Sequence, residues 1–325
     1  MRTAWLKIKM GFCIVLLFAV IYALLVVIAT FAGVGTPMIY AVLAFVMVAI
    51  QFFLGPKIVE RTMRIRYVSE GEQPELHRMV SELATKAGIP KPRVGISEIP
   101  ISNAFAFGTS NRTARVCVTR RLLEMMHRDE LEAVLGHELS HIKHRDMAVI
   151  TALSVIPMIC YFIYVSFFWS GIFGGGGRNR QGALPMMAIA LIAFVVYFMS
   201  NLIVLYASRI REYYADAGSV ELTRKPHALA SALYRMIYDG ARVKPDAVRK
   251  EMGGMRAFFA TDPITARGDL KDLSAADLDR NGSIDAHELK LFAERAKARR
   301  ADKLVEIFST HPTPVSRIKR LGGYP

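Results

Sequence analysis

Long apolar runs without a single Asp, Glu, Lys or Arg alternate with mixed polar segments along this chain of 325 residues. Four such runs cover residues 10–31, 37–54, 147–169 and 184–206. Each reaches or approaches the ~20 residues that a membrane-spanning helix needs. The first run is too long for a signal peptide, lacks a convincing cleavage site and is followed at once by the second run. The pattern therefore predicts four transmembrane helices in two hairpins.

In the polar segments between these runs, apolar side chains recur at the spacings of helices and strands. Residues 74–87 carry apolar side chains at helical spacing, with Pro74 at the start and Gly88 just after the end. Short β-rich runs predict strands at 93–97, 104–107 and 115–119. Further helices are predicted at 122–126, 128–144 and 226–240. The fold class is thus a mainly α integral membrane protein that carries an α+β domain with a small β-sheet.

The distribution of charge along the chain predicts which side of the membrane carries the polar domain. Lys and Arg number 42 against 28 Asp and Glu, a formal net charge of +14. The basic residues lie beside the apolar runs, as at Lys57, Arg61, Lys143, Arg209 and Arg211, and no nucleic-acid-binding module accompanies them. Basic flanks mark the cytoplasmic side, where they attract anionic lipid. We expect a multi-pass membrane protein, of the cell inner membrane if bacterial, with its polar domain in the cytoplasm and no nucleic-acid partner.

The three cysteines, Cys13, Cys117 and Cys160, form no spaced motif. The sequence therefore predicts neither a disulfide framework nor a cysteine-based metal site.

Candidate chemistry begins in segment 128–144, which contains His137-Glu138-x-x-His141. Residues four apart share one face of a helix, so both imidazoles can bind one metal ion. Glu138 lies about 100° further round the helix, where it can act as general base on a metal-activated water. Zinc peptidases use this arrangement, although a pattern of five residues also arises by chance.

A third ligand is offered by Glu212. The fourth apolar run leads directly into Glu212 and Asp216, and only residues 142–146 separate His141 from the third run. If both helices leave the membrane side by side, Glu212 reaches the histidines and a fourth position stays open for water. Asp216 is then placed to orient a ligand histidine. The alternative is that Glu212 is a solvated charge at a helix end.

Four ordered motifs carry a family resemblance. They lie at residues 103–108, 137–141, 211–216 and 310–318. Through them the chain resembles the HtpX-type membrane zinc endopeptidases, relatives of the CAAX prenyl proteases, over residues 57–225, the four spans and the tail after Phe308. The resemblance implies a gluzincin-like site with one Zn²⁺ per chain on His137, His141 and Glu212, and Glu138 as base. It also implies a stress-response role in protein quality control, cleaving misfolded or damaged membrane proteins.

The same resemblance implies two further parts of the site. Asn103, Ala104, Phe105 and Ala106 are expected on an edge strand that pairs with an extended polypeptide substrate. Asn103 could otherwise simply start that strand. His311 and Arg317 are expected to approach the metal and stabilise the oxyanion. The alternatives are a turn residue before Pro312 and a surface charge.

A second metal motif lies outside the family resemblance. Residues 277–288 match the EF-hand loop of twelve residues at every ligand position. The predicted ligands are Asp277, Asp279, Asn281, Ser283 through its carbonyl, Asp285 and Glu288, with Gly282 at the sharp turn. Segment 262–300 therefore reads as an insertion that binds Ca²⁺ or Mg²⁺ and modulates proteolysis. The alternative is an acidic turn between two helices.

Taken together, these features predict a zinc endopeptidase that acts on polypeptides, membrane proteins above all, at the lipid bilayer. A CAAX-type processing peptidase is one alternative, and a Ca²⁺-sensing membrane scaffold with an inactive protease site is another. The predicted domains are a transmembrane hairpin (1–56), the first protease part (57–146), a second hairpin (147–207), the second protease part (208–261), the EF-hand-like insertion (262–300) and the C-terminal protease part (301–325).

Overall fold

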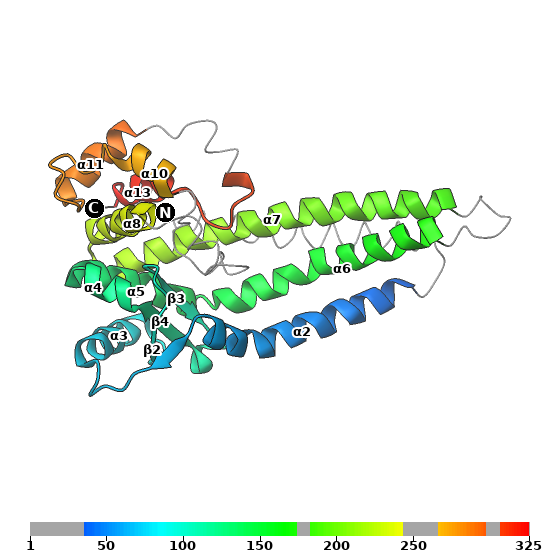
Figure 1. The fold of residues 1–325 in the computed structure, drawn as a ribbon, viewed down its shortest axis with the longest axis horizontal. Coiled ribbons are helices and arrows are strands. Elements are labelled where there is room, and N and C mark those ends of the chain that lie inside the picture. The colour runs from blue at the N-terminus through cyan, green and yellow to red at the C-terminus, as the bar shows by residue number, and fades with distance from the viewer. Residues whose placement is uncertain (1–35, 174–182, 243–265, 297–305, 325) are drawn as a thin grey trace. The chain divides into compact units, whose positions relative to one another are not determined.

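The computed structural model describes residues 36–173, 183–242, 266–296 and 306–324 (Figure 1). The chain forms two compact units. Of the described residues, one unit combines 36–55 with 148–173 and 183–210, and the other combines 56–147 with 211–242, 266–296 and 306–324. The predicted first span, 10–31, lies outside the described residues.

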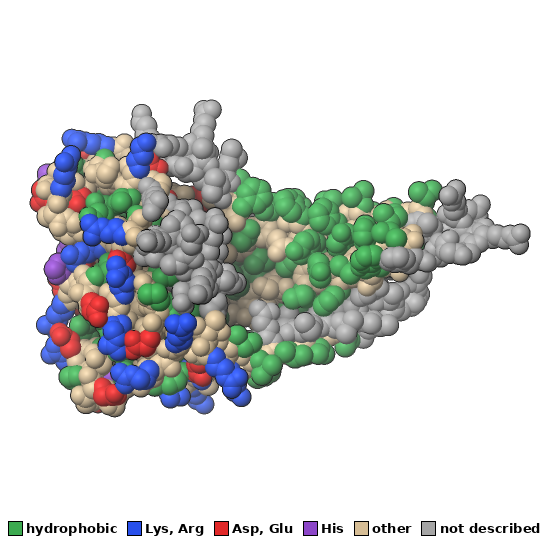
Figure 2. Space-filling view, in the orientation of Figure 1, with side chains coloured by type: hydrophobic (Ala, Val, Ile, Leu, Met, Phe, Trp, Pro, Cys, Tyr) green, Lys and Arg blue, Asp and Glu red, His purple; other side chains and the backbone are tan. Residues whose placement is uncertain are grey.

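Long apolar helices make up the first unit. Helices α6 (Asp146–Phe173) and α7 (Ala183–Thr223) cover the predicted third and fourth spans, and both are long and apolar enough to cross a membrane. The first two residues of α6 and residues 211–223 of α7 belong to the second unit. Figure 2 shows their visible surface covered by hydrophobic side chains, and Leu184 and Leu191 are 78% and 64% exposed. Helix α2 (Thr36–Thr62) covers the predicted second span. Among the described helices, α6 and α7 alone meet the criteria for a span, so the crossing by α2 stays a prediction.

A four-stranded sheet lies in the second unit. Its strands are β1 (Ile65–Tyr67), β2 (Arg93–Ser97), β3 (Ala104–Phe107) and β4 (Arg115–Thr119), in the order β1-β2-β4-β3. The pair β2–β4 is parallel, and the other two pairs are antiparallel. Three strands match the predicted bounds, whereas β1, with three residues, is too short to show a period of two. Strand β3 ends the sheet, as the predicted edge strand requires.

Helices of the second unit also follow the predicted pattern. They are α3 (Pro74–Ala87), α4 (Arg120–Met125), α5 (Arg128–Lys143) and α8 (Pro226–Arg242), with a short 3₁₀ turn at Asn111–Thr113. Helix α3 ends where Gly88 adopts a left-handed conformation (φ 69°) and its N–H reaches the carbonyls of Ala84 and Thr85. Helix α4 starts two residues before the predicted Leu122, because the Thr119 side chain caps it by accepting from the Leu122 N–H.

The hydrophobic core places α5 against the sheet. Leu76, Val80 and Leu83 of α3 and Leu131, Leu135 and Leu139 of α5 are buried with one face of β2 and β4. Such burial of large aliphatic side chains contributes ~1.5–3 kcal/mol for each. The helix that carries both predicted histidine ligands is therefore fixed by its leucine stripe.

A second cluster surrounds the EF-hand-like segment. It joins α8 to α10 (Ala266–Leu273), α11 (Ala286–Arg295) and α13 (Pro314–Leu321). Helix α10, which contains Gly268, has only eight residues. Helix α11 begins at Ala286, inside the EF-hand-like loop, and continues beyond it. An added Cβ at Gly322, just after α13, would meet the Cβ of Ala293 at 2.5 Å, so α11 and α13 are in close contact.

Candidate metal centre

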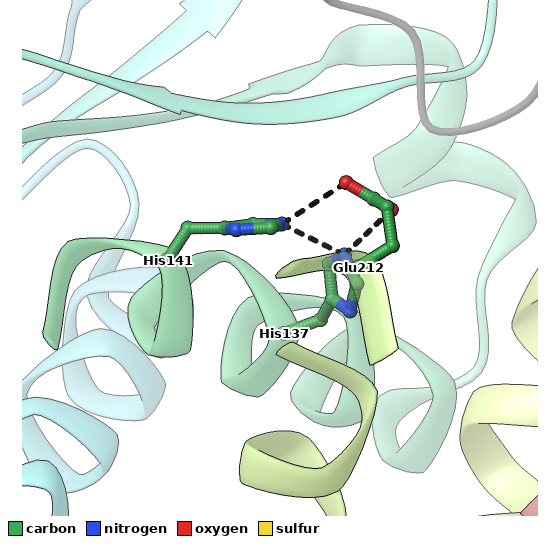
Figure 3. Close-up of side chains that lie close together, drawn as sticks. All are labelled: His137, His141 and Glu212. Carbon is green, nitrogen blue, oxygen red and sulfur yellow. Dashed lines mark hydrogen bonds and ion pairs between the residues drawn. The ribbon is translucent and has the colours of Figure 1, made fainter. Parts of the chain in front are cut away.

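Three predicted ligands converge between α5 and α7 (Figure 3). His137 and His141 project from successive turns of α5, and their Nε2 atoms lie 3.1 Å apart. Glu212 comes from α7, which continues as one helix past the apolar run, as predicted. Its carboxylate lies 3.6 Å from His137 Nε2 and 3.5 Å from His141 Nε2.

Small residues let the two helices come close enough for this convergence. An added Cβ at Gly218 of α7 would lie 2.0 Å from Ser140 Oγ and 2.7 Å from Ser140 Cβ. One turn earlier on α5, Gly136 faces Ser219 and Thr223 in the same way, at 3.3 Å. The Ser219 hydroxyl donates to the carbonyl of Ala133 at 2.6 Å, which ties α7 to α5.

Each histidine is oriented by a carboxylate at its second ring nitrogen. His137 Nδ1 lies 3.0 Å from Asp216 Oδ1, as predicted, and His141 Nδ1 lies 2.5 Å from Asp146 Oδ2. A histidine that donates its Nδ1–H to a carboxylate presents a lone pair at Nε2. In this tautomer the two Nε2 lone pairs face each other at 3.1 Å, a separation that a shared cation or proton can bridge.

An arginine holds each of these carboxylates. Arg317 makes a two-pronged contact with Asp216, with Nε 3.0 Å and Nη2 2.6 Å from the two carboxylate oxygens. Arg211 Nε lies 3.1 Å from Asp146 Oδ1. The buried charged side chains around the two histidines thus include more acids than bases. When the histidines are neutral, this group carries two negative charges in excess. Its charged members are Glu138, Asp146, Glu212, Asp216, Arg211 and Arg317, all buried.

The donor set fits a zinc ion. Ligand atoms at about 2.0–2.1 Å from a tetrahedral zinc lie about 3.3–3.4 Å apart, close to the separations seen here. Glu212 Oε2 is buried and makes no hydrogen bond, so it has a coordination position to offer. Burial lowers the pKa of His137, but the neighbouring carboxylates of Asp216 and Glu212 outweigh this effect and raise the pKa to about 9. The pocket therefore favours positive charge at this point, as a divalent cation would supply.

Glu138 lies between the histidines and the sheet. Its side chain is 5% exposed, and its carboxylate accepts a hydrogen bond from the backbone N–H of Ala106 on β3. Burial raises the pKa of Glu138 above its ordinary value, against the lowering influence of His137 and His141. A carboxylate in this position can exchange a proton with a water next to the ligand atoms.

The C-terminal residues His311 and Arg317 both reach the site. His311 Nδ1 lies 3.3 Å from Glu212 Oε2, and both ring nitrogens of His311 are buried without a hydrogen bond. Arg317 is 2% exposed, and its Nε and Nη2 atoms donate to the Asp216 carboxylate. Its third nitrogen, Nη1, lies 3.4 Å from Glu212 Oε2. The two residues therefore differ, because His311 retains donor capacity and Arg317 is largely engaged.

The predicted substrate strand lies next to Glu138. The Asn103 carbonyl accepts from Thr119 N–H at 2.9 Å, and Phe105 pairs with Cys117, so the backbone groups of these odd-numbered residues face β4. The backbone N–H and C=O groups of Ala104 and Ala106 face away from β4, toward the edge of the sheet. The Asn103 side chain is fully buried.

Two members of the network were not predicted in this role. Asp146 is the first residue of α6, whereas from the sequence it was expected only to separate His141 from the third apolar run. Arg211 was interpreted as a residue that flanks the membrane. A lone acidic residue at the start of an apolar run, five positions after His141, was the signal that could have identified Asp146.

A second acidic cluster occupies the EF-hand-like loop. Carboxylate oxygens of Asp277, Asp279 and Glu288 lie within 4.8 Å of one another, and Gly282 has the left-handed backbone (φ 84°) that its turn position requires. The Glu288 carboxylate also accepts from the backbone N–H groups of Leu278 and Asp285, and the remaining predicted ligands are engaged locally as well. Asn281 accepts from Ser283 N–H at 2.8 Å, and Asp285 caps α11 by accepting from Glu288 N–H at 2.7 Å.

Two histidines one helical turn apart and a glutamate from a second helix are the ligand set of a metallopeptidase. Comparison with known proteins agrees, since residues 70–324 match peptidase family M48. The chain belongs to this family.

Named relatives and a solved structure extend the match. The chain is 52% identical over 232 residues to a protease HtpX homolog of Methanothermobacter thermautotrophicus, which covers 71% of this chain and 86% of the relative. It is 38% identical over 292 residues to a protease HtpX homolog of Aeropyrum pernix, covering 88% and 85%. The crystal structure of S. mikatae Ste24p shares the fold, with a TM-score of 0.52 at 16% identity over 99% of this chain and 67% of that chain.

Proposed function

We propose that the protein is a membrane zinc endopeptidase in which His137, His141 and Glu212 hold one Zn²⁺ and Glu138 is the general base. The observation that carries the proposal is the convergence of the three ligand side chains, with both Nδ1 atoms held by carboxylates. Membership of a peptidase family and relatives named as proteases support the activity.

A bound zinc ion would polarise the scissile carbonyl and lower the pKa of a water to about 7. Glu138 takes a proton from this water while the oxygen of the water attacks the carbonyl carbon. It then delivers the proton to the amide nitrogen as the C–N bond breaks. The Ala106 N–H holds the Glu138 carboxylate in place for both transfers.

His311 is the better candidate to stabilise the oxyanion. Its ring nitrogens are buried beside Glu212 without a hydrogen bond, so it can donate to an oxygen that develops charge. Arg317 acts instead by holding Asp216, and through it His137. This division of roles replaces the shared role that the family resemblance implied.

The substrate backbone pairs with β3 at the edge of the sheet. Ala104 offers its N–H and C=O groups on that side and Ala106 its C=O group, while Asn103 and Phe105 hold β3 to β4. Recognition through main-chain hydrogen bonds accepts many sequences, which suits a peptidase of quality control. The apolar helices α6 and α7 support action at a membrane. We propose membrane proteins as substrates and, from the basic residues beside the apolar runs, a catalytic unit in the cytoplasm.

The test is hydrolysis of casein by the purified full chain. We expect activity that a zinc chelator abolishes and added Zn²⁺ restores. Chelator-resistant digestion would refute the metal-dependent mechanism. Cleavage confined to prenylated C-terminal peptides would favour a CAAX-type processing peptidase, and no cleavage by a zinc-loaded protein would favour a scaffold.

We also propose that loop 277–288 binds Ca²⁺ and modulates this activity. The converging carboxylates and the left-handed Gly282 favour it. Two connections lead from the loop toward the metal centre. Ile284 N–H donates to Ser231 Oγ, whose hydroxyl donates to Glu130 in the first turn of α5.

The second connection runs through α11, which packs on α13, the helix of Arg317. A fully zinc-loaded enzyme should therefore change its rate of casein hydrolysis when Ca²⁺ is added, and an Asp277→Asn variant should not respond. Equal rates with and without Ca²⁺ in the wild type would refute the modulation.

A further inference from the structure

The carboxylate of Asp146 bridges the two helices that supply the candidate ligands. Asp146 is 4% exposed, with Oδ2 2.5 Å from His141 Nδ1 and Oδ1 3.1 Å from Arg211 Nε. Arg211 is 8% exposed and immediately precedes Glu212. One buried side chain thus connects His141 of α5 to the turn of α7 that carries Glu212.

The backbone conformation just before Asp146 directs its side chain toward His141. Helix α5 ends at Lys143, His144 caps it, and Arg145 adopts a left-handed conformation with φ 54°. Residues other than glycine seldom adopt this conformation, and it persists only where the surroundings enforce it. The left-handed residue breaks the helix so that α6 begins at Asp146, with its carboxylate directed back to His141.

The arrangement repeats the one around His137. In one series His137 contacts Asp216 and Asp216 contacts Arg317. In the other His141 contacts Asp146 and Asp146 contacts Arg211. Both ligand histidines are therefore oriented by a buried carboxylate that a buried arginine holds.

We propose that Asp146 is a positioning residue of the metal centre, which fixes the ring of His141 and couples it to Glu212 through Arg211. This inference rests on the proposed function. It gives the start of α6 a part in zinc binding. Carboxylates that orient ligand histidines raise metal affinity, and their loss typically weakens it 10–100-fold.

The test measures zinc affinity by competition with a chromogenic chelator, using the full chain in detergent. Asp146→Asn keeps the size of the side chain and removes its charge, whereas Asp146→Ala removes the contact. The matched control is Asp239→Asn, because Asp239 is also buried and paired with an arginine, Arg121, but contacts neither histidine. We expect affinity to fall about 10–100-fold in Asp146→Ala and less in Asp146→Asn, and to stay at the wild-type value in Asp239→Asn.

A purely structural role predicts something different. It would lower the thermal stability of the zinc-free variants and leave zinc affinity unchanged. We also expect the visible spectrum of the Co²⁺-substituted protein to shift in Asp146→Asn, since that spectrum reports ligand geometry. Combining Asp146→Asn with Arg211→Gln should weaken zinc binding no further than the first change alone.

Wild-type zinc affinity in both Asp146 variants would overturn the inference and leave the proposed function standing. A wild-type chain that binds no zinc would overturn both. If Asp146→Ala does not fold, Asp146→Asn decides the question by itself.

Discussion

Gly218→Ala tests whether the close approach of α5 and α7 sets the metal site. The new Cβ would lie 2.0 Å from Ser140 Oγ and 2.7 Å from Ser140 Cβ, whereas heavy atoms in contact prefer about 3.5–4.0 Å. Rotation of the Ser140 hydroxyl relieves the first overlap. The second requires the helices to separate by roughly 1 Å. Overpacking of this kind costs about 1–3 kcal/mol of stability, and a 1 Å displacement at a catalytic site can reduce the rate about 100-fold.

The assay combines zinc content, casein hydrolysis and thermal unfolding of purified Gly218→Ala. We expect less bound zinc, about 100-fold lower activity and a lower unfolding midpoint. Adding Ser140→Gly removes the obstructing Cβ and should restore zinc and part of the activity. Gly268→Ala in α10 is the control, because nothing lies within 4 Å of its added Cβ. Full zinc and wild-type activity in Gly218→Ala would refute the reasoning.

Three further outcomes are expected. Glu138→Gln should keep zinc and lose about 10²–10⁴-fold in activity, measured by metal analysis and casein hydrolysis; a fully active variant would remove Glu138 as base. Ala106→Pro should fold, since the lost N–H faces away from β4, yet lose activity because Glu138 loses its donor; unchanged hydrolysis would argue against that contact. Gly282→Ala should weaken Ca²⁺ binding measured by calorimetry, because φ is 84° there; equal affinity would contradict the assigned loop geometry.

Local pattern predicted most of the catalytic unit's elements. The bounds of α3 and of β2, β3 and β4 agree with the sequence analysis, because each has a clear period and ends at turn residues. The continuation of the fourth apolar run as a helix through Glu212 and Asp216 was a condition of the predicted site, and α7 meets it. Strand β1 was missed since three residues show no alternation, and it exists through pairing with β2.

The candidate site was only partly predictable, for physical reasons. His137, Glu138 and His141 lie within one helical turn, so their proximity is local. Asp146 belongs to the site because Arg145 adopts a left-handed conformation, which no periodic pattern reveals. The different surroundings of His311 and Arg317 depend on packing between segments about 100 residues apart, such as that of Arg317 with Asp216.

The most direct test of the account is zinc stoichiometry together with casein hydrolysis in the wild type, Glu138→Gln and Glu212→Ala, purified side by side. We expect one zinc per chain and hydrolysis in the wild type. We expect one zinc without hydrolysis in Glu138→Gln, and loss of both in Glu212→Ala. Full zinc in Glu212→Ala, or hydrolysis by Glu138→Gln at the wild-type rate, would contradict the assigned roles.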